Sequence, residues 1–223
     1  MRGCCDSIDS ILTWILCFSQ TEKDQETEAD NANQISSFRW YVLEGKWIDV
    51  FPIYRSNSKY HEIKINRSRG TALHVAVNDG RVELVNSLVG TILQHEERGV
   101  LSDESALRST NERGDTPLHL AASRGFIDTC KCIIGENGER KDLIKVKNKN
   151  GETPLFRAVL TYHKKTFVYL HHVSKDLDVP LRNHDGDNIL HHAIWREFLG
   201  KPAFNCMFIH PFISDVYFLK LKS

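Results

Sequence analysis

The sequence of 223 residues carries no net formal charge and shows no apolar run long enough to cross a membrane. Its 29 lysine and arginine residues equal its 29 aspartate and glutamate residues, so no overall field attracts nucleic acid or anionic lipid. The apolar run at residues 11–18 is much shorter than the roughly 20 residues that span a bilayer. We therefore expect an ordinary soluble protein that binds no nucleic acid.

Cysteine is sparse, and no pair has the C-x-x-C spacing that zinc sites usually need. Asp6 and Asp9 lie where a secretory signal carries positive charge, so we expect reduced thiols and a cytoplasmic protein. Cys4 and Cys5 stand beside the apolar run and are candidate sites of S-acylation at the cytosolic face of the plasma membrane. The alternative for this region is a short helix or a disordered leader. The remaining cysteines are Cys17, Cys130, Cys132 and Cys206.

Catalytic motifs are also absent from the sequence. It contains no phosphate-binding loop, dinucleotide fingerprint, nucleophile elbow, kinase motif or HExxH zinc motif. Histidines crowd the stretch from His163 to His192, but no helical histidine pair with a carboxylate ligand is evident, so we interpret them as structural. Cys130 and Cys132 fit core packing better than a redox pair. We therefore expect no catalytic residue, cofactor, metal or small-molecule substrate.

What the sequence does contain is one phrase that recurs along the chain. The spacing between successive copies is 45, 37 and 35 residues, measured between Thr71, Thr116, Thr153 and Asn188. Recurrence at a period of 20–50 residues is typical of solenoids and other repeat architectures. The copies read RGTALHVAVNDG from Arg69, GDTPLHLAASRG from Gly114, GETPLFRAVL from Gly151 and GDNILHHAI from Gly186.

Each copy of the phrase predicts a pair of helices. Thr116 before Pro117 predicts a helix start, because a threonine hydroxyl caps a free amide and proline suits the first helical position. Gly80 and Gly125 are expected to end the first helices, where glycine takes a positive φ without strain. Apolar residues at i, i+3 and i+4 then predict the second helices. The residues expected to be buried are Leu118, Ala121 and Ala122, and the stripes Val82, Leu84, Val85, Leu88 and Ile127, Cys130, Ile133, Ile134.

Turn-forming residues separate the units and predict hairpin fingers between them. His74, His119 and His191 share one position of the phrase, where we expect the imidazole to bond to the phrase's threonine or to neighbouring backbone. At the fourth copy Asn188 replaces the threonine, so that bond should differ. The expected finger tips are Asn66–Gly70, Asn111–Asp115, Asn148–Glu152 and Asn183–Asp187.

Two stretches depart from the regular repeat. The 45-residue spacing holds an insertion, which we place between Gly90 and Thr110, in the loop after a second helix. A degenerate unit precedes Thr71, because a shift of 35 residues places Gly45 on Gly80, although the phrase itself is lost there. Terminal repeats are often atypical, since one face has no neighbour to pack against.

Together these features resemble the ankyrin repeat, whose unit is about 33 residues long. The resemblance implies an all-α solenoid of helix–turn–helix repeats with short β-hairpin fingers, a degenerate first repeat and a truncated last repeat. The stretch from Ser36 to Phe198 is also similar to plant ankyrin proteins related to the accelerated-cell-death and salt-tolerance proteins. That similarity implies a role in stress or defence signalling at membranes, although no counterpart of the family's C-terminal membrane domain is evident. The residues that carry it are Gly45–Trp47, Gly151–Phe156, Phe167–His171 and Arg182–His191.

We expect three parts in the chain: a disordered or short-helical leader over residues 1–35, a repeat domain over 36–199 and a non-repeat tail over 200–223. The units are expected at about 36–68, 69–113, 114–150, 151–185 and, in part, 186–199. Because the tail has no phrase, we expect an array cut short, as in a truncated or alternatively ended product. Low order after Gly200 and a tendency to self-associate should follow.

The function expected from such an array is non-catalytic protein binding through the finger tips and the exposed sides of the first helices, because stacked repeats present an extended concave surface. The run from Arg140 to Lys149 is interpreted as a finger that contacts an acidic or phosphorylated partner, or else stays solvated. An alternative function is a membrane-proximal regulator, tethered by N-terminal S-acylation or by a membrane partner. The residues expected to contact the partner are Arg113, Lys147, Lys149, Asn150 and Asp185.

Overall fold

The computed structural model describes residues 31–96 and 105–189 of the chain. Residues 31–43 are helical and precede α2 (Trp47–Ser56). The other elements in order are α3 (Lys59–Glu62), α4 (Ala72–Asn78), α5 (Val82–His95), η2 (Ala106–Arg108), α6 (Pro117–Arg124), α7 (Ile127–Ile134), η3 (Lys141–Lys145), α8 (Pro154–Leu160) and α9 (Lys164–Val173). The predictions about the first 30 residues, His191 and the tail lie outside the described residues.

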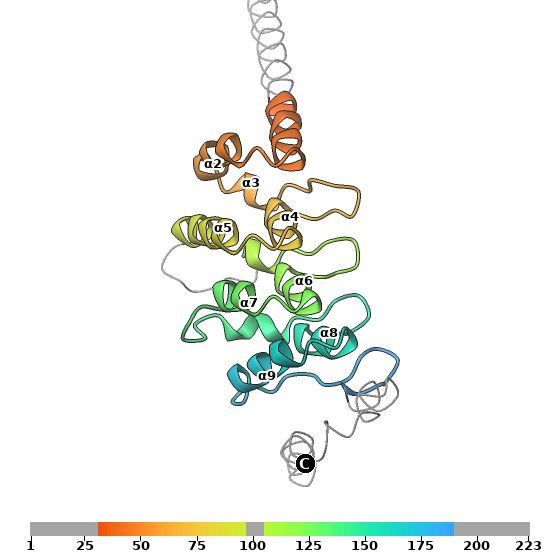
Figure 1. Ribbon diagram of the computed structural model, residues 1–223. Coiled ribbons are helices and arrows are strands. Elements are labelled where there is room, and N and C mark those ends of the chain that lie inside the picture. Colours follow the sequence, from red (N-terminus) through yellow and green to blue (C-terminus); the bar gives the residue numbers. More distant parts are fainter. Residues whose placement is uncertain (1–30, 97–104, 190–223) are drawn as a thin grey trace, which may run out of the picture.

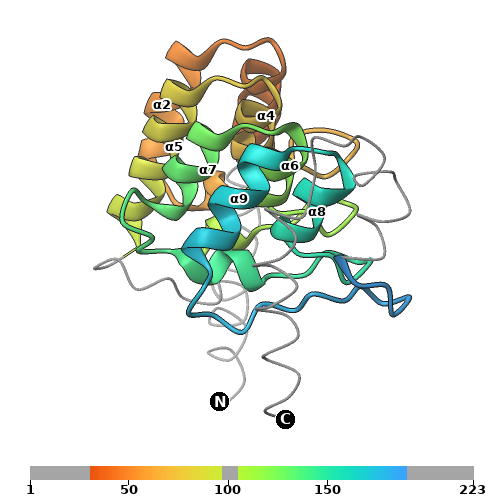
Figure 2. The same cartoon turned by 60° about the horizontal axis from the view of Figure 1, so that its bottom comes forward.

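The helices stack as successive antiparallel pairs (Figure 1). The helix of residues 31–43 and helices α4, α6 and α8 form one layer, while α2, α5, α7 and α9 form the other. Figure 2 shows α4 and α6 side by side in one layer and α5 and α7 in the second. The all-α solenoid expected from the sequence is therefore confirmed. Residues 31–35, which the sequence assigns to the leader, are already part of the first helix.

The first helices begin as the phrase predicts. The hydroxyl of Thr116 accepts a hydrogen bond from the amide of His119 (3.4 Å), and Thr153 accepts one from Phe156 (3.3 Å). Pro117 occupies the start of α6, where its missing N–H costs nothing. Gly125 ends α6 with a φ of 77°, and a side chain there would collide with the ring of His163. Caps and glycine together fix the length of the first helix.

Equivalent residues of the first helices form the core. Phe38, Leu73, Leu118 and Leu155 are each at most 1% exposed. Phe38 lies 35 residues before Leu73, which is the shift that places Gly45 on Gly80. The degenerate first unit therefore packs in the same register as the others, although it has lost the phrase. In this unit Phe38 stands where the other units have leucine.

The first part of the inserted stretch lengthens a helix. Helix α5 contains 14 residues and α7 contains 8, and α5 continues past Gly90 to His95. The prediction that the insertion extends the loop from Gly90 is therefore wrong for its first part. Ile92 is fully buried four residues after Leu88, so the apolar stripe continues the helix for another turn.

No described helix is both long enough and apolar enough to cross a membrane.

Candidate protein-binding surface

Four hairpin fingers project from the same side of the stack (Figure 1). We number them by their tips: finger 1 is Asn66–Gly70, finger 2 is Asn111–Asp115, finger 3 is Asn148–Glu152 and finger 4 is Asn183–Asp187. Fingers 2 to 4 close through a backbone bond from the first residue to the last, as between the amide of Asn111 and the carbonyl of Asp115 (3.0 Å). The prediction of fingers is thus confirmed, although within the described residues only Arg182 and Asn188 form a β-bridge.

The asparagine that opens each finger holds the turn with its side chain. In finger 2 the Oδ1 atom of Asn111 accepts from the amides of Arg113 (2.9 Å) and Asp115 (3.0 Å). Asn148 makes the same pair of bonds in finger 3, to the amides of Asn150 and Glu152 (both 3.0 Å). Asparagine suits this role because its short amide bonds to backbone groups a few residues on.

Backbone hydrogen bonds join neighbouring fingers tip to tip. The amide of Glu112 donates to the carbonyl of Ser68 (2.7 Å), and that of Lys149 donates to Arg113 (3.1 Å). The amide of His184 then donates to Asn150 (2.9 Å). Three successive contacts of this kind make the tips one continuous ridge. Side chains on the ridge are therefore held at fixed spacing.

The phrase histidines bond helices α4 and α6 to the finger that follows each of them. In His119 the Nδ1 atom accepts from the amide of Thr116 (3.1 Å), so the proton is on Nε2, which donates to the carbonyl of Glu152 (3.0 Å). His74 repeats the arrangement with Thr71 and the carbonyl of Asp115 (3.0 Å). Burial lowers the pKa of each imidazole to about 4, so both are neutral at pH 7. The predicted structural role is confirmed for these two histidines.

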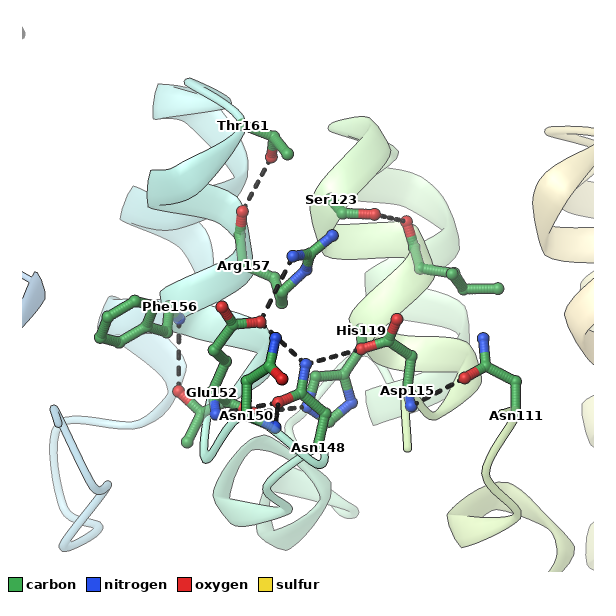
Figure 3. A network of polar contacts seen from close by, with 12 residues as sticks. Asn111, Asp115, His119, Ser123, Asn148, Asn150, Glu152, Phe156, Arg157 and Thr161 are labelled. Carbon is green, nitrogen blue, oxygen red and sulfur yellow. Dashed lines mark hydrogen bonds and ion pairs between the residues drawn. The ribbon is translucent and has the colours of Figure 1, made fainter. Parts of the chain in front are cut away.

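A buried polar network supports fingers 2 and 3 (Figure 3). The Nδ2 atom of Asn148 donates to Oδ1 of Asp115 (2.8 Å) and to Oε2 of Glu152 (2.9 Å). Arg157 on α8 completes the network, with Nη1 3.3 Å from the same Glu152 oxygen. Asp115 and Glu152 are only 2% and 6% exposed, so these charges serve the fold and are shielded from a partner.

All five residues predicted to contact a partner are exposed. Arg113, Lys149 and Asn150 lie together, because fingers 2 and 3 pair through the backbone of the first two and Asn150 is next in the chain. Asp185 lies on finger 4, and Lys147 immediately precedes finger 3. The structure thus brings three of them together and leaves the other two at the edges. Their role in binding stays a prediction.

The run from Arg140 to Lys149 is only partly in a finger, contrary to the prediction. Lys141–Lys145 form the turn η3, because Leu143 and Ile144 are buried against the core. Lys147 and Lys149 alone bring lysine ammonium groups from this run to the finger. Before them, the guanidinium group of Arg140 donates to the carbonyls of Ile133 (2.8 Å) and Cys132 (3.1 Å) in α7.

The exposed sides of the first helices belong to the expected binding surface, although the individual residues on them were missed by sequence reasoning. Trp40, Val75, Leu120 and Arg157 occupy equivalent positions, and we call the surface they share the inner face. Trp40 is 49% exposed, and Leu43, one turn further, is 58% exposed. Val75 and Leu120 are half-buried. The 35-residue shift already places Trp40 on Val75, so the signal was present in the sequence.

Other candidate chemistry finds little support in the part of the chain that the structure describes. No group of three histidine, cysteine, aspartate or glutamate side chains there could hold a metal ion. Cys130 is fully buried, and burial raises the pKa of its thiol to about 12, so the predicted packing role is confirmed. A groove at the first unit, of about 590 Å³, has no acidic or basic side chain on its walls. It is lined by Asn33, Gln34, Ser37, Tyr41, Ile53, Ser56 and Tyr60.

Comparison with known proteins agrees with this architecture. A family model for three copies of the ankyrin repeat matches residues 29–145 and again residues 73–182. The potassium channel AKT2/3 of Arabidopsis thaliana is 24% identical over 68% of this chain and 17% of its own length. The human transient receptor potential cation channel subfamily A member 1 is 30% identical over 55% of this chain and 10% of its own length. The ankyrin repeat-containing protein ITN1 of Arabidopsis thaliana is 30% identical over 47% of this chain and 19% of its own length. The chain thus matches less than a fifth of each of these relatives.

Proposed function

Since the chain belongs to the ankyrin-repeat family, we propose that it is a non-catalytic scaffold that holds a partner protein along its fingers and inner face. Stacked repeats suit this task because each unit packs only on its neighbours and adds one more stretch to a continuous surface. No enzyme family matches the chain among the comparisons above, and the buried side chains of His74, His119 and Glu152 are held in structural hydrogen bonds.

One observation carries the proposal: hydrogen bonds fix the backbone of the fingers, while the side chains of Arg113 and Lys149 at their tips take no part in these bonds. Asn111 and Asn148 hold the turns, and backbone bonds join the tips. Arg113 and Lys149 contribute only main-chain atoms to these bonds. A rigid backbone that presents side chains the fold does not use is preorganised for binding, because little freedom is lost when a partner docks.

The test uses a five-site alanine variant of Arg113, Lys147, Lys149, Asn150 and Asp185. Because these side chains are exposed, we expect its melting temperature to stay close to that of the wild-type chain. Affinity capture from a native extract, read by quantitative mass spectrometry, should lose a partner that the wild-type chain retains. A control variant with Arg81, Lys165 and Lys175 changed to alanine should keep that partner. Retention by the five-site variant, or its unfolding, would contradict the assignment.

We propose a setting in plant stress or defence signalling, in the cytoplasm or at the cytosolic face of the plasma membrane. The proposal is supported by the resemblance of the first and fourth units to the plant family and by the similarity to the Arabidopsis protein ITN1. Loss of a stress-response phenotype on deletion of the gene, with rescue by the wild-type chain but not by the five-site variant, would test it.

The second candidate function is a membrane-proximal regulator. It is supported by the adjacent Cys4 and Cys5 in the sequence and by two similar proteins that are named as ion channels. Tethering by S-acylation predicts that the wild-type chain is recovered with membranes and that a Cys4→Ser/Cys5→Ser variant is not. Equal distribution of both would leave a membrane partner as the only route, and recovery of both away from membranes would exclude this function.

A further inference from the structure

The fingers carry an excess of exposed positive charge. We call the five exposed cations on and beside fingers 1 to 3 the basic ridge, and Glu112 is the exposed carboxylate among them. Within residues 31–96 and 105–189, none of the five forms an ion pair with another described side chain. The basic ridge consists of Arg67, Arg69, Arg113, Lys147 and Lys149.

The remaining carboxylates of fingers 2 and 3 do not pair with the basic ridge. Asp115 and Glu152 are buried, and their oxygens accept hydrogen bonds from Asn148. Arg157 takes the second contact of Glu152. The carboxylates of Asp115 and Glu152 are thus bonded within the fold, whereas the cations of the basic ridge face solvent, although the overall charge of the chain is zero. A local field of one sign on a neutral protein indicates a partner of the opposite sign.

An apolar shelf lies at the first-unit end of the same surface. Trp40 and Leu43 expose about half of their surface, 49% and 58% respectively. Lys46 lies over Trp40, with Nζ 3.8 Å from the centroid of the ring. The shelf therefore offers an apolar contact with an ammonium group beside it. Exposed tryptophan is a common anchor in protein interfaces because it buries a large area at low entropic cost.

We infer that the scaffold binds an extended acidic segment of its partner, with a bulky apolar residue near one end that docks on Trp40 and Leu43. This inference rests on the proposed function and names the chemistry of its partner. Helices that pack in contact are about 8–10 Å apart, so three steps from the shelf to finger 3 cover about 24–30 Å. An extended chain advances about 3.3–3.6 Å per residue, so the segment has about eight residues.

Finger 4 sets the limit of the segment. It exposes Asp185, with Asp187 half-buried behind it. The cation beside finger 4, Arg182, already donates to the carbonyl of Gly186 (2.8 Å), so an acidic chain that continued past finger 3 would meet the carboxylate of Asp185. The bound segment therefore ends at finger 3, or changes there from acidic to basic residues.

The test selects binders from a displayed library of random ten-residue peptides, with the full chain as bait. We expect enrichment of Asp and Glu, with one Trp, Phe or Leu near an end of the peptide. A selected peptide is then titrated against variants by fluorescence anisotropy. Raising the salt from 50 to 500 mM should weaken binding at least tenfold, because the contacts are between exposed charges.

Two pairs of matched variants locate the binding site. The triple variant Arg67→Glu/Arg113→Glu/Lys149→Glu should weaken binding by about 10- to 100-fold, as expected for the loss of three surface ion pairs. Arg81→Glu/Lys165→Glu/Lys175→Glu changes the net charge equally but lies outside the fingers and should bind normally. Trp40→Ala/Leu43→Ala should weaken binding, whereas Ile48→Ala, which removes an 89% exposed apolar side chain from α2, should not.

The outcomes separate this inference from the proposed function. Enrichment of basic or uncharged peptides that still need the fingers would overturn the acidic segment and leave the scaffold function intact. Selected peptides that bind both triple variants equally would overturn both. A 20-nucleotide RNA or vesicles with anionic lipid that bind the basic ridge more tightly than the acidic peptide would also overturn the inference.

Discussion

Replacement of Asn148 by alanine should destabilise the chain far more than replacement of its neighbour Asn150. Asn148 is 6% exposed and its side chain makes four hydrogen bonds within fingers 2 and 3. Two of them are donated to the carboxylates of Asp115 and Glu152. Asn150 is exposed and only its backbone is used in the finger. The same residue type, two positions apart, thus has opposite roles.

The magnitude follows from the four bonds. Hydrogen bonds to charged groups contribute about 1.5–3 kcal/mol each and neutral ones about 0.5–1.5 kcal/mol, so the lower limits sum to about 4 kcal/mol. Water that enters the vacated space restores part of this. We therefore expect Asn148→Ala to lower the free energy of unfolding by about 2–4 kcal/mol. Asn150→Ala should change it by less than about 0.5 kcal/mol.

Urea unfolding of both variants, followed by far-UV circular dichroism and by tryptophan fluorescence, measures the difference. Coincident transitions by the two probes are needed, because repeat arrays can unfold in parts. Asn148→Asp adds a third carboxylate at the site and should be at least as damaging at pH 7, with partial recovery as the pH falls toward 4. Equal stability of Asn148→Ala and Asn150→Ala would refute the role given to the buried network.

Three further predictions concern the stack. Ala121 is fully buried in α6, so Ala121→Leu should cost roughly 1–3 kcal/mol through overpacking, measured by urea unfolding; a neutral result would show unfilled space there. Burial lowers the pKa of His74 and of His119 to about 4 in the folded chain, against about 6.5 in the unfolded chain. Their contribution to the free energy of unfolding is therefore complete above pH 6.5 and is lost as the pH falls toward 4. His119→Phe should flatten this pH dependence of the unfolding free energy, and an unchanged slope would contradict the assignment. Tyr162 follows α8 at the position that Gly125 has after α6, and its φ is 63°. Tyr162→Gly should therefore raise the melting temperature by removing about 1 kcal/mol of backbone strain, and a lower melting temperature would mean that the contacts of the ring outweigh the strain.

The helices and fingers could be predicted because each depends on a local signal. Thr116, Pro117 and Gly125 mark both ends of α6, and the asparagine that opens a finger closes its own turn. Such hydrogen bonds join residues within a few positions of each other, so a short sequence pattern is enough to predict them. The same holds for the phrase histidine, whose bond to its threonine is local.

Features that depend on distant contacts could not be predicted. The bonds of Asn148 to Asp115, 33 residues earlier, link two units, and no local pattern shows them. Leu143 and Ile144 pack in the core, and the first half of the run from Arg140 to Lys149 therefore forms η3 instead of a finger. Trp40 is a different case: the 35-residue shift places it on Val75, but it was overlooked because the first unit has lost the phrase.

Hydroxyl-radical footprinting of the chain with and without its captured partner determines which layer of the stack the partner covers. The method reports the exposure of side chains, and large apolar side chains are exposed on both layers of the stack: Trp40 and Leu43 on the inner face, and Ile48 and Val168 on the second helices. We expect the partner to suppress oxidation of Trp40 and Leu43 and to leave the oxidation of Ile48 and Val168 unchanged. Protection of Ile48 or Val168, with Trp40 still oxidised, would place the partner on the opposite side of the stack and refute binding at the inner face.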